Sequence, residues 1–291
     1  MQPLLHASIN LPLLHQGKVR DIFDIDESTM LIVTTDRLSA FDVVFNQPIP
    51  QKGAVLTSVA NYWFNKTEHI IPNHLTNIAL EDVLSKEEAA QLKGRAIVVK
   101  KLRPIVVEAV VRGYLIGSGW KEYQSTGSVC SIQLPRNLRL AQQLDSPLYT
   151  PSSKAAVGEH DINISFEETE NMLGTELANQ VKDVSLSIYQ FAANHALTRG
   201  IIIADTKFEF GLDEANRLTL MDEVLTPDSS RFWAKDSYQV GHSPQSYDKQ
   251  IIRDYLETLD WGKTPPAPTL PDEILQKTAE KYQEVRSILC T

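Results

Sequence analysis

Three ionisable residues alternate along one predicted β-strand. Residues 201–210, IIIADTKFEF, have the apolar content and the two-residue alternation of a strand. Asp205, Lys207 and Glu209 therefore fall on one face, at intervals of about 6.6 Å along the chain. The strand does not need these charges to fold. Two carboxylates and an amine on one face could bind a divalent metal ion or lie beside reacting groups.

A second run of strand type begins at Leu218, and the two runs form a predicted hairpin. If Ala215 and Asn216 make a two-residue turn, Glu209 lies opposite Asp222. Facing carboxylates destabilise a sheet unless a cation lies between them, and Mg²⁺ commonly uses one or two carboxylates together with nucleotide phosphates. This register predicts that Glu209 and Asp222 bind Mg²⁺. A turn two residues earlier would pair Glu209 with Leu218 and leave the acids as surface charges.

A short basic motif with a glycine occurs near the N-terminus. Residues 17–20, GKVR, begin the first strand of a predicted hairpin that ends at Thr35. Gly17 allows close approach of the backbone to a ligand, and Lys18 and Arg20 could meet the negative charge of nucleotide phosphates. The motif lacks the second glycine and the Ser or Thr of a P-loop, so a solvated basic strand edge is the alternative.

Two loops that follow predicted strands combine acidic, basic and hydroxyl side chains. The first, DRLSAFD at 36–42, contains Asp36 and Ser39, which could bind a ligand or could cap turns. The second, LTPDSSRFW at 225–233, follows the hairpin directly. Its Arg231 could bind a phosphate or a carboxylate close to the predicted metal site.

A carboxylate and an arginine lie at the end of the apolar segment 95–111. Glu108 interrupts the apolar strand pattern, which is costly unless the carboxylate is paired or faces a site. The next stretch, RGYLIGSGW at 112–120, is rich in glycine and serine. Arg112 offers a planar fork of donors, and Ser118 and backbone N–H groups add more, which suits an anion. A tight glycine turn would have the same composition.

The segment 150–165 has the composition of a loop and contains Lys154, Glu159, His160 and Asp161. A metal site here is poorly supported, because adjacent histidine and aspartate side chains do not normally point the same way. The polar loop is therefore a weaker candidate for metal binding than the hairpin.

Amphipathic helices are predicted in three parts of the chain. Apolar residues recur at helical spacing from Gly53 to Phe64 and again over the last 18 residues, where they should pack on the body of the protein. Ser165 and Glu168 form a capping box at the start of a long helical pattern that continues past Ile188. This helix leads directly into the strand at 201–210.

Composition restricts the class of protein. A chain of 291 residues with 42% hydrophobic content can bury a large core. The net charge of -9 disfavours nucleic acid as a partner, since phosphate affinity comes from clustered Lys and Arg. Cys130 and Cys290 are far apart and predict free thiols in a reducing compartment. No signal peptide and no run of about 18 apolar residues is present, which predicts a cytoplasmic location and no membrane partner.

Six segments together closely resemble the SAICAR synthetase family, the phosphoribosylaminoimidazole-succinocarboxamide synthases, over nearly the whole chain. They occur in the order typical of that family, and the last two are the most specific. The segments are GKVRDIF at 17–23, DRLSAFD at 36–42, VVRGYLIGSGWKEY at 110–123, TPSSKAAVGEHD at 150–161, IADTKFEFG at 203–211 and DEVLTPDSSRFW at 222–233.

The resemblance implies an ATP- and Mg²⁺-dependent ligase of purine biosynthesis. Its small-molecule substrates would be L-aspartate and carboxyaminoimidazole ribonucleotide (CAIR), with SAICAR, ADP and phosphate as products. It implies an α+β fold in two parts, with a β-rich ATP-binding subdomain at 1–108 and a larger α/β subdomain at 109–291 that carries the metal and substrate sites. ATP would lie in the cleft between them. Nothing in the pattern sets the oligomeric state.

The resemblance also implies roles for individual residues. Asp205 and Lys207 would border the reacting groups, and Glu209 and Asp222 would bind Mg²⁺, in agreement with the predicted hairpin register. ATP contacts would come from Gly17, Lys18, Val19, Arg20, Lys100 and Glu108. Substrate contacts would come from Asp36, Ser39, Arg112, Ser118, Lys154, Asp161, Ser230 and Arg231. Within that last set, the three residues that would hold the ribonucleotide, most plainly its 5′-phosphate, are Arg112, Ser118 and Arg231.

Three features leave the function open at this point. The hairpin turn has Glu-Ala-Asn-Arg where the family favours Asn-Gly. A small-molecule kinase would use the same ATP cleft and acidic metal ligands for transfer to a hydroxyl. A nucleotide-sensing module would bind ATP without forming ADP, although the density of ionisable groups argues against it.

Overall fold

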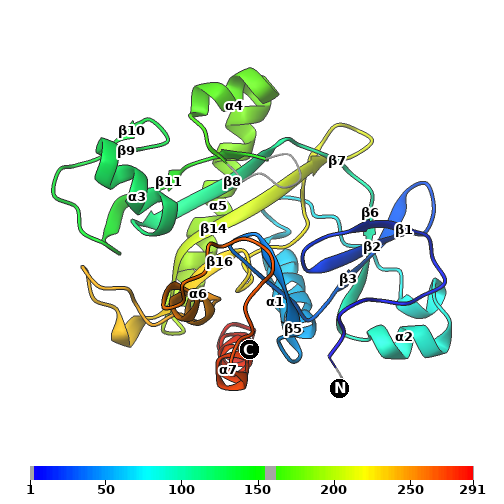
Figure 1. Cartoon of the computed structure of the whole chain (residues 1–291). Helices are drawn as coiled ribbons and strands as arrows, with labels where there is room; N and C mark the ends of the chain where they lie inside the picture. Colours follow the sequence, from blue (N-terminus) through cyan, green and yellow to red (C-terminus); the bar gives the residue numbers. More distant parts are fainter. Residues whose placement is uncertain (1–2, 155–161, 291) are drawn as a thin grey trace.

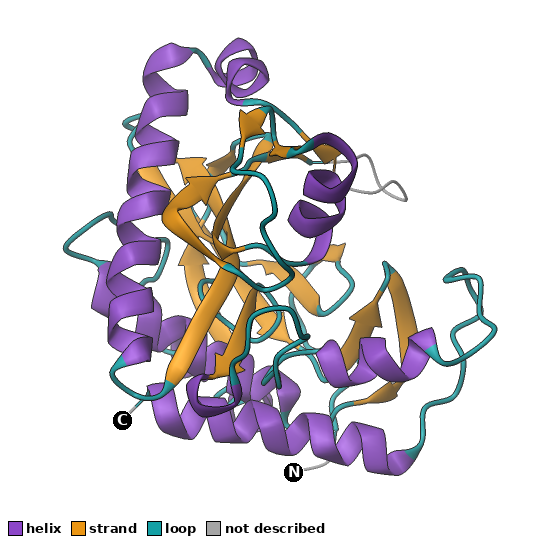
Figure 2. Ribbon diagram, turned by 90° about the vertical axis from the view of Figure 1, so that its left-hand side faces the viewer, coloured by secondary structure: helices purple, strands orange, loops and turns teal. Residues whose placement is uncertain are grey.

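A computed structural model describes residues 3–154 and 162–290 of the chain. Two β-sheets form its interior, and the helices lie along the outside (Figure 2). A smaller N-terminal sheet lies beside a larger central sheet, and the C-terminal helix lies below both in the view of Figure 1. The arrangement is α+β, as the sequence predicts.

The N-terminal sheet is antiparallel, and its predicted first hairpin is confirmed. Its strands follow the spatial order β1 (Leu13–Gln16), β2 (Arg20–Asp24), β3 (Thr29–Thr34) and β6 (Ala96–Lys100). Alternate apolar residues such as Phe23, Leu31 and Val98 pack with Leu92 of α2 (Lys86–Leu92) on one face. The opposite face is turned toward the central sheet and carries Arg20 at the start of β2.

The central sheet is built around two long antiparallel strands, β8 (Val107–Tyr114) and β14 (Ile201–Leu212). Its main path runs β13 (Ile162–Asn163), β12 (Ser152–Ser153), β8, β14 and β15 (Leu218–Met221). Three further strands pair off this path: β11 (Gln143–Tyr149) with β8, and β7 (Arg103–Pro104) and β16 (Ser230–Ala234) with β14. Two small hairpins stand apart, namely β4 (Arg37–Ala40) with β5 (Val43–Pro48) and β9 (Ser128–Val129) with β10 (Ile132–Gln133).

The largest core lies between the central sheet and the long helices. The remaining helices are α1 (Lys52–Thr67), α3 (Gly117–Thr126), α4 (Phe166–Leu173), α5 (Thr175–Leu197), α6 (Gln250–Glu257) and α7 (Asp272–Leu289), with short 3₁₀ turns at Leu80–Asp82 and Lys235–Ser237. Trp63 and Phe64 of α1 are fully buried in that core, as their spacing predicts. Gly53 begins α1 against the N-terminal sheet, where a Cβ would lie 2.1 Å from the Thr34 carbonyl oxygen.

The long helix predicted from Ser165 onward is two helices. The capping box is confirmed, because Ser165 accepts a hydrogen bond from the Glu168 N–H and the Glu168 carboxylate accepts one from the Ser165 N–H. The helix then ends at Gly174, whose φ of 83° takes the backbone out of the helical region before α5 begins. In the described part of the chain, no helix has the length and apolarity to cross a membrane.

The register of the central hairpin differs by one residue from the prediction. The Asp213 and Arg217 backbones close a three-residue loop, in which Asn216 has the expected positive φ of 57°. Because the loop holds one residue more than a two-residue turn, Glu209 lies opposite Met221 rather than Asp222, and the alternative pairing with Leu218 is also wrong. Asp222 follows β15 with a φ of 66° and turns out of the sheet.

The predicted boundary at Glu108 falls inside β8, one residue after that strand begins. Strand β7, which precedes the predicted boundary, already pairs with β14, so the central sheet includes segments on both sides of that boundary. Helix α1, from the N-terminal part, packs against α7 from the C-terminal end. The division into subdomains 1–108 and 109–291 stays a prediction.

Candidate active site

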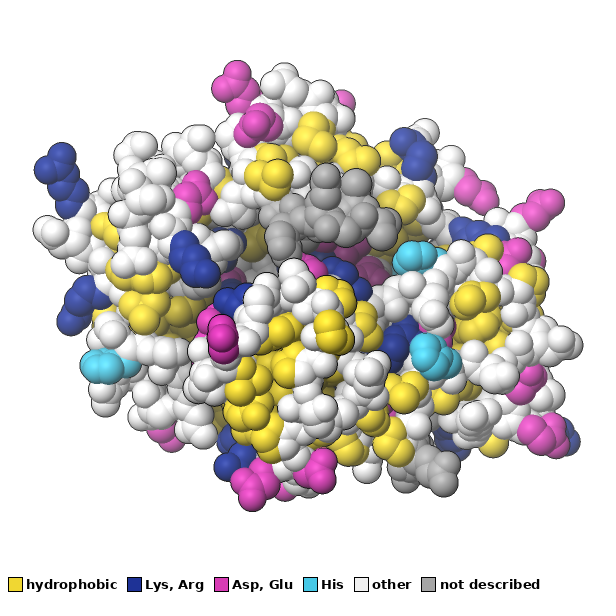
Figure 3. Space-filling view, in the orientation of Figure 1, with side chains coloured by type: hydrophobic (Ala, Val, Ile, Leu, Met, Phe, Trp, Pro, Cys, Tyr) yellow, Lys and Arg dark blue, Asp and Glu magenta, His cyan; other side chains and the backbone are white. Residues whose placement is uncertain are grey.

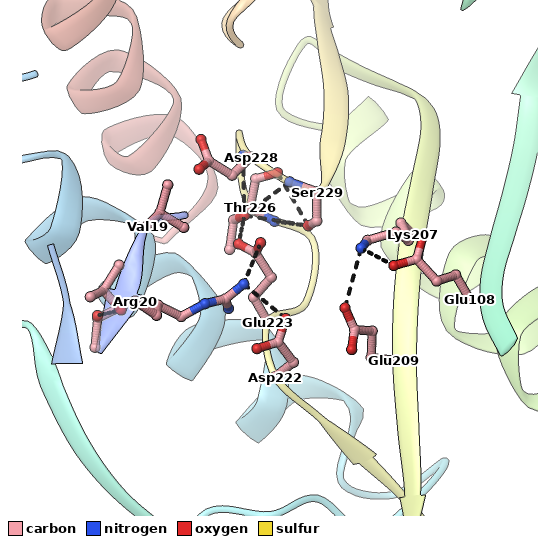
Figure 4. A network of polar contacts seen from close by, with 12 residues as sticks. Val19, Arg20, Glu108, Lys207, Glu209, Asp222, Glu223, Thr226, Asp228 and Ser229 are labelled. Atoms are coloured by element: carbon pink, nitrogen blue, oxygen red, sulfur yellow. Dashed lines mark hydrogen bonds and ion pairs between the residues drawn. The ribbon is translucent and has the colours of Figure 1, made fainter. Parts of the chain in front are cut away.

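The ionisable face of β14 is the centre of the candidate site (Figure 4). Lys207 Nζ lies 2.5 Å from Glu108 Oε1 on β8 and 3.2 Å from Glu209 Oε1, and Lys154 Nζ donates to Glu209 Oε2 at 2.6 Å. Burial opposes both charges, but the neighbouring opposite charges outweigh it. They raise the pKa of Lys207 and lower the pKa of Glu209 to about 2. Lys207 and Glu209 are therefore both charged at neutral pH.

A second cluster joins the two sheets. Arg20 of β2 reaches Asp222 and Glu223, which directly follow β15, at 2.8 Å and 3.2 Å. Burial, opposed by Arg20, raises the pKa of Asp222 to about 7, with Glu209 and Glu223 adding to the rise. One guanidinium thus faces two carboxylates, and the cluster carries surplus negative charge when both are ionised. Val19 lies beside Arg20 in the crevice between β2, β3, β6 and α1.

A third cluster has the opposite surplus. Arg112 of β8 and Arg231 of β16 flank Asp205, because β14 lies between their strands and pairs Asp205 with each of them. Arg112 Nη1 lies 3.1 Å from Asp205 Oδ2, and Arg231 contacts the same oxygen. Arg112 also donates to Ser118 Oγ at 2.9 Å. Two guanidinium groups on one carboxylate leave one positive charge in surplus.

Glycines let the start of α3 approach both guanidinium groups. Gly117 has a φ of 60°, and a Cβ there would lie 2.5 Å from Arg231 Nη2. At Gly119 a Cβ would lie 3.1 Å from the Arg112 side chain. The N-terminus of this ten-residue helix therefore points its free N–H groups and the Ser118 hydroxyl into the basic cluster. Arginine forks, a hydroxyl and a helix N-terminus are groups that suit a phosphate, so the predicted phosphate contact stays a prediction with compatible geometry.

The loop from Asp222 to Arg231 connects the acidic and basic clusters. Thr226 Oγ1 donates to Glu223 Oε2 at 2.5 Å, and the Ser229 carbonyl accepts from the Lys207 N–H at 3.0 Å. Ser230 Oγ shares a hydrogen bond of 2.8 Å with Thr206 of β14. Figure 4 shows the loop between Arg20 on one side and Lys207 on the other.

A fourth cluster forms around Asp228 of this loop and was not predicted. Asp228 Oδ2 lies 2.7 Å from Lys52 Nζ at the start of α1 and 3.1 Å from Lys249 Nζ before α6. Tyr282 of α7 donates to Asp228 Oδ1 at 2.8 Å. Burial opposes the charge of Asp228, but the two lysines outweigh it and hold its pKa well below the usual value. Lysines at the starts of two helices, 197 positions apart in the printed sequence, give no local pattern that would reveal the cluster.

Most of the predicted site residues lie in these clusters, but Asp36 does not. It is fully buried, and its carboxylate accepts from the Leu4 N–H, the Gly53 N–H and Arg95 at 2.8 to 2.9 Å. Both oxygens are therefore engaged in holding α1 and the N-terminal segment together. The prediction that Asp36 contacts substrate is corrected to an anchoring role.

The other predicted residues lie around the rim or in the interior. Lys18 is exposed and 2.5 Å from Asp42 Oδ1, and Gly17 donates its N–H to the Arg20 carbonyl. Lys100 is exposed at the end of β6, and Ser39 is buried in β4. Their ligand roles, like those of the clusters, stay predictions. Asp161 lies outside the described residues, as do Glu159 and His160.

Charged side chains of both signs gather in a hollow near the centre of the face in Figure 3. Within residues 3–154 and 162–290, no three His, Cys, Asp or Glu side chains are grouped so that they could hold a metal ion by themselves. Two carboxylates with surplus negative charge, such as Asp222 and Glu223, still suit Mg²⁺, because this ion usually completes its coordination with water and phosphate oxygens.

Comparison with known proteins decides the family. Residues 13–268 match the family model described as SAICAR synthetase. The chain is 61% identical to the phosphoribosylaminoimidazole-succinocarboxamide synthase of Cupriavidus necator, with 97% of this chain and 95% of that protein covered. The chain belongs to the SAICAR synthetase family.

Solved structures agree with the fold. The SAICAR synthase from Saccharomyces cerevisiae, solved with SAICAR, has a TM-score of 0.88 and 42% identity, and the match covers 96% of this chain and 95% of that one. A SAICAR synthetase solved in complex with ADP has a TM-score of 0.70 at 22% identity, with 94% and 96% covered, and so shows the same fold. Family membership confirms the predicted class, an ATP-dependent ligase of purine biosynthesis, over the kinase and the sensing module.

Proposed function

We propose that this enzyme joins L-aspartate to the carboxylate of CAIR, with ATP and Mg²⁺, to give SAICAR, ADP and phosphate. The observation that carries the proposal is the sharing of Asp205 by Arg112 and Arg231 under the N-terminus of α3. That cluster suits the 5′-phosphate of a ribonucleotide, because a dianion can neutralise the surplus charge and accept hydrogen bonds from Ser118 and the helix N–H groups.

The acidic cluster supports a nucleotide and metal site at the junction of the two sheets. Mg²⁺ bound at Asp222 and Glu209, with Glu223 beside them, would shield the charge on the ATP phosphates during transfer. Arg20 and Lys154 now neutralise those carboxylates. Both cations would be released to face phosphate oxygens when a metal ion takes their place, and Lys18 and Val19 lie on the same strand entry.

The chemistry requires activation of a poor electrophile. An oxygen of the CAIR carboxylate attacks the γ-phosphorus of ATP, the bond from that phosphorus to the bridging oxygen breaks, and ADP leaves as an acyl phosphate forms. The amine of L-aspartate then attacks the acyl carbon, loses a proton and displaces inorganic phosphate. Lys207, held between Glu108 and Glu209, supplies fixed positive charge beside the transferring group.

An ADP-release assay with each substrate omitted in turn tests this function. We expect inorganic phosphate and ADP in equal amounts only when CAIR and L-aspartate are both present. Steady ADP formation with a stable phosphorylated acceptor would instead identify a kinase. A cytoplasmic location is part of the proposal, and it is supported by the free Cys130 and Cys290 thiols.

A further inference from the structure

The four ion clusters around the loop differ in the balance of their charges. Lys154 and Lys207 balance Glu108 and Glu209, while Arg20 faces two carboxylates. Elsewhere in the described chain, buried Arg37 and Arg95 pair one to one with Asp21 and Asp36. A surplus of either sign in a buried cluster is costly unless a ligand compensates it. The two surpluses beside β14 already have proposed ligands, a metal ion and a ribonucleotide phosphate.

One surplus has no proposed ligand. Lys52 and Lys249 both contact Oδ2 of Asp228, and among the ion pairs of the described residues neither lysine has another carboxylate. Burial lowers the pKa of Lys52; Asp228 opposes this shift and Lys249 adds to it. The arrangement therefore brings two like charges together in a place where repulsion and desolvation both oppose them.

The surplus charge can be reached from one side. Lys52 is fully enclosed, whereas the Lys249 side chain keeps 11% of its surface exposed. Asp228 directly precedes Ser229, Ser230 and Arg231 in the same loop, and Glu223 is close enough to influence the pKa of Lys52. An anion bound at Lys249 would therefore lie near both the basic and the acidic clusters.

The proposed reaction includes one anionic substrate to which no cation has yet been assigned. The proposed function assigns the ribonucleotide phosphate to Arg112 and Arg231, and the ATP phosphates to the cations of the acidic site. L-Aspartate carries two further carboxylates, which must be desolvated and oriented before its amine can attack. We propose that Lys249, supported by Lys52 and Asp228, binds a carboxylate of the amino-acid substrate. This inference rests on the proposed function and places the site for the second substrate on the α6 side of the loop.

Neutral substitutions of the two lysines test the site. In the full-length enzyme, Lys249→Met should raise the KM for L-aspartate by about tenfold to a hundredfold, since hydrogen bonds to charged groups have this strength. The KM values for CAIR and ATP should stay within about twofold. The Ki of succinate, a dicarboxylate without the amine, should rise in parallel, and Lys249→Arg should restore part of the affinity. Lys52→Met should give a smaller change in the same direction.

Thermal unfolding distinguishes ligand binding from a structural role. Removal of one lysine leaves a balanced pair with Asp228, so the unfolding midpoint should stay the same or rise. Lys277→Met, at an exposed position of α7, is the matched control and should alter neither KM nor midpoint.

Two results would overturn the site. They are an unchanged KM for L-aspartate in Lys249→Met, and an equal rise of all three KM values together with a lower midpoint. ADP release by the wild-type enzyme without any need for L-aspartate would overturn the proposed function as well.

Discussion

The basic cluster around Asp205 and the acidic cluster around Arg20 are mirror images in charge. Each contains three buried or half-buried ions with one charge in surplus. The basic cluster is built from three neighbouring strands of one sheet, so hydrogen-bonded register fixes its geometry. The acidic cluster spans two sheets, with Arg20 from one and Asp222 from the end of the other. A positive surplus suits an anionic ligand and a negative surplus suits a cation. A cluster that spans two sheets can also change its geometry more easily than one built within a single sheet.

The strongest test removes a carboxylate from the acidic cluster. Asp222→Asn should lower kcat by at least about a hundredfold. The substitution removes a proposed ligand of Mg²⁺, and without the metal ion the charge on the transferring phosphoryl group is no longer stabilised. Far-UV circular dichroism should remain that of the wild type. Glu214→Gln, in the exposed hairpin loop, is the control and should keep full activity. Wild-type turnover of Asp222→Asn at limiting Mg²⁺ would contradict the metal assignment.

Removal of a guanidinium group from the basic cluster should affect binding more than turnover. Arg231→Met leaves Asp205 balanced by Arg112, and the KM for CAIR should rise by about tenfold to a hundredfold. The KM for ATP should not change, since the basic cluster is separate from the junction of the sheets. Steady-state kinetics with Arg136→Met as an exposed control would check this. Equal increases in the KM for CAIR and the KM for ATP would show that the two clusters are not independent.

The comparison also explains what the sequence could predict. Alternation along β14 correctly placed Asp205, Lys207 and Glu209 on one face, because strand periodicity is local. The glycines after Arg112 correctly indicated a close approach, because they let α3 lie against the Arg112 and Arg231 guanidinium groups, while the anion site itself stays a prediction. Local patterns failed to give the exact length of the hairpin loop. The loop has three residues rather than two, and the partner of Glu209 across the hairpin is therefore Met221 rather than Asp222.

Long-range partners explain the other errors. Asp36 has the composition expected of a site residue, but its partners Leu4, Gly53 and Arg95 come from three distant segments. Lys52 was not singled out from the sequence, because its partner Asp228 is 176 positions away. Sequence therefore predicted the residues of the sheet clusters better than those of the cluster around Asp228.

Competition between Arg20 and a metal ion in the acidic cluster can be tested by a binding measurement that does not require enzyme activity. Arg20→Gln should strengthen the binding of Mn²⁺ to the nucleotide-free enzyme by about fivefold, because the arginine competes with the metal ion for Asp222. Titration calorimetry or the electron paramagnetic resonance of free Mn²⁺ would measure this. Lys18→Gln, which changes an exposed cation two residues away, should leave the affinity unchanged. Weaker Mn²⁺ binding in Arg20→Gln would mean that the arginine organises the metal site instead.

The effect that depends on no ligand concerns a residue that connects the two sheets. His74 donates its N–H to the Leu220 carbonyl of β15 and accepts from the Lys100 N–H of β6, and its buried ring nitrogens have no hydrogen-bond partner among the described residues. Burial, with Arg20 and Lys100 adding, lowers its pKa to about 3. The folded state thus resists protonation that the unfolded state accepts near pH 6.5. Stability from this group is complete above pH 6.5 and is lost as the pH falls toward 3.

His74→Leu should remove that loss. Between pH 6.5 and 4.5, the free energy of unfolding of the wild type should fall by up to about 1.4 kcal/mol per pH unit more than that of the variant. Urea unfolding at several pH values would measure the difference, and His242→Leu, on the surface, should behave as the wild type. Equal slopes for wild type and His74→Leu would mean that the buried ring is not what makes the junction of the sheets sensitive to acid.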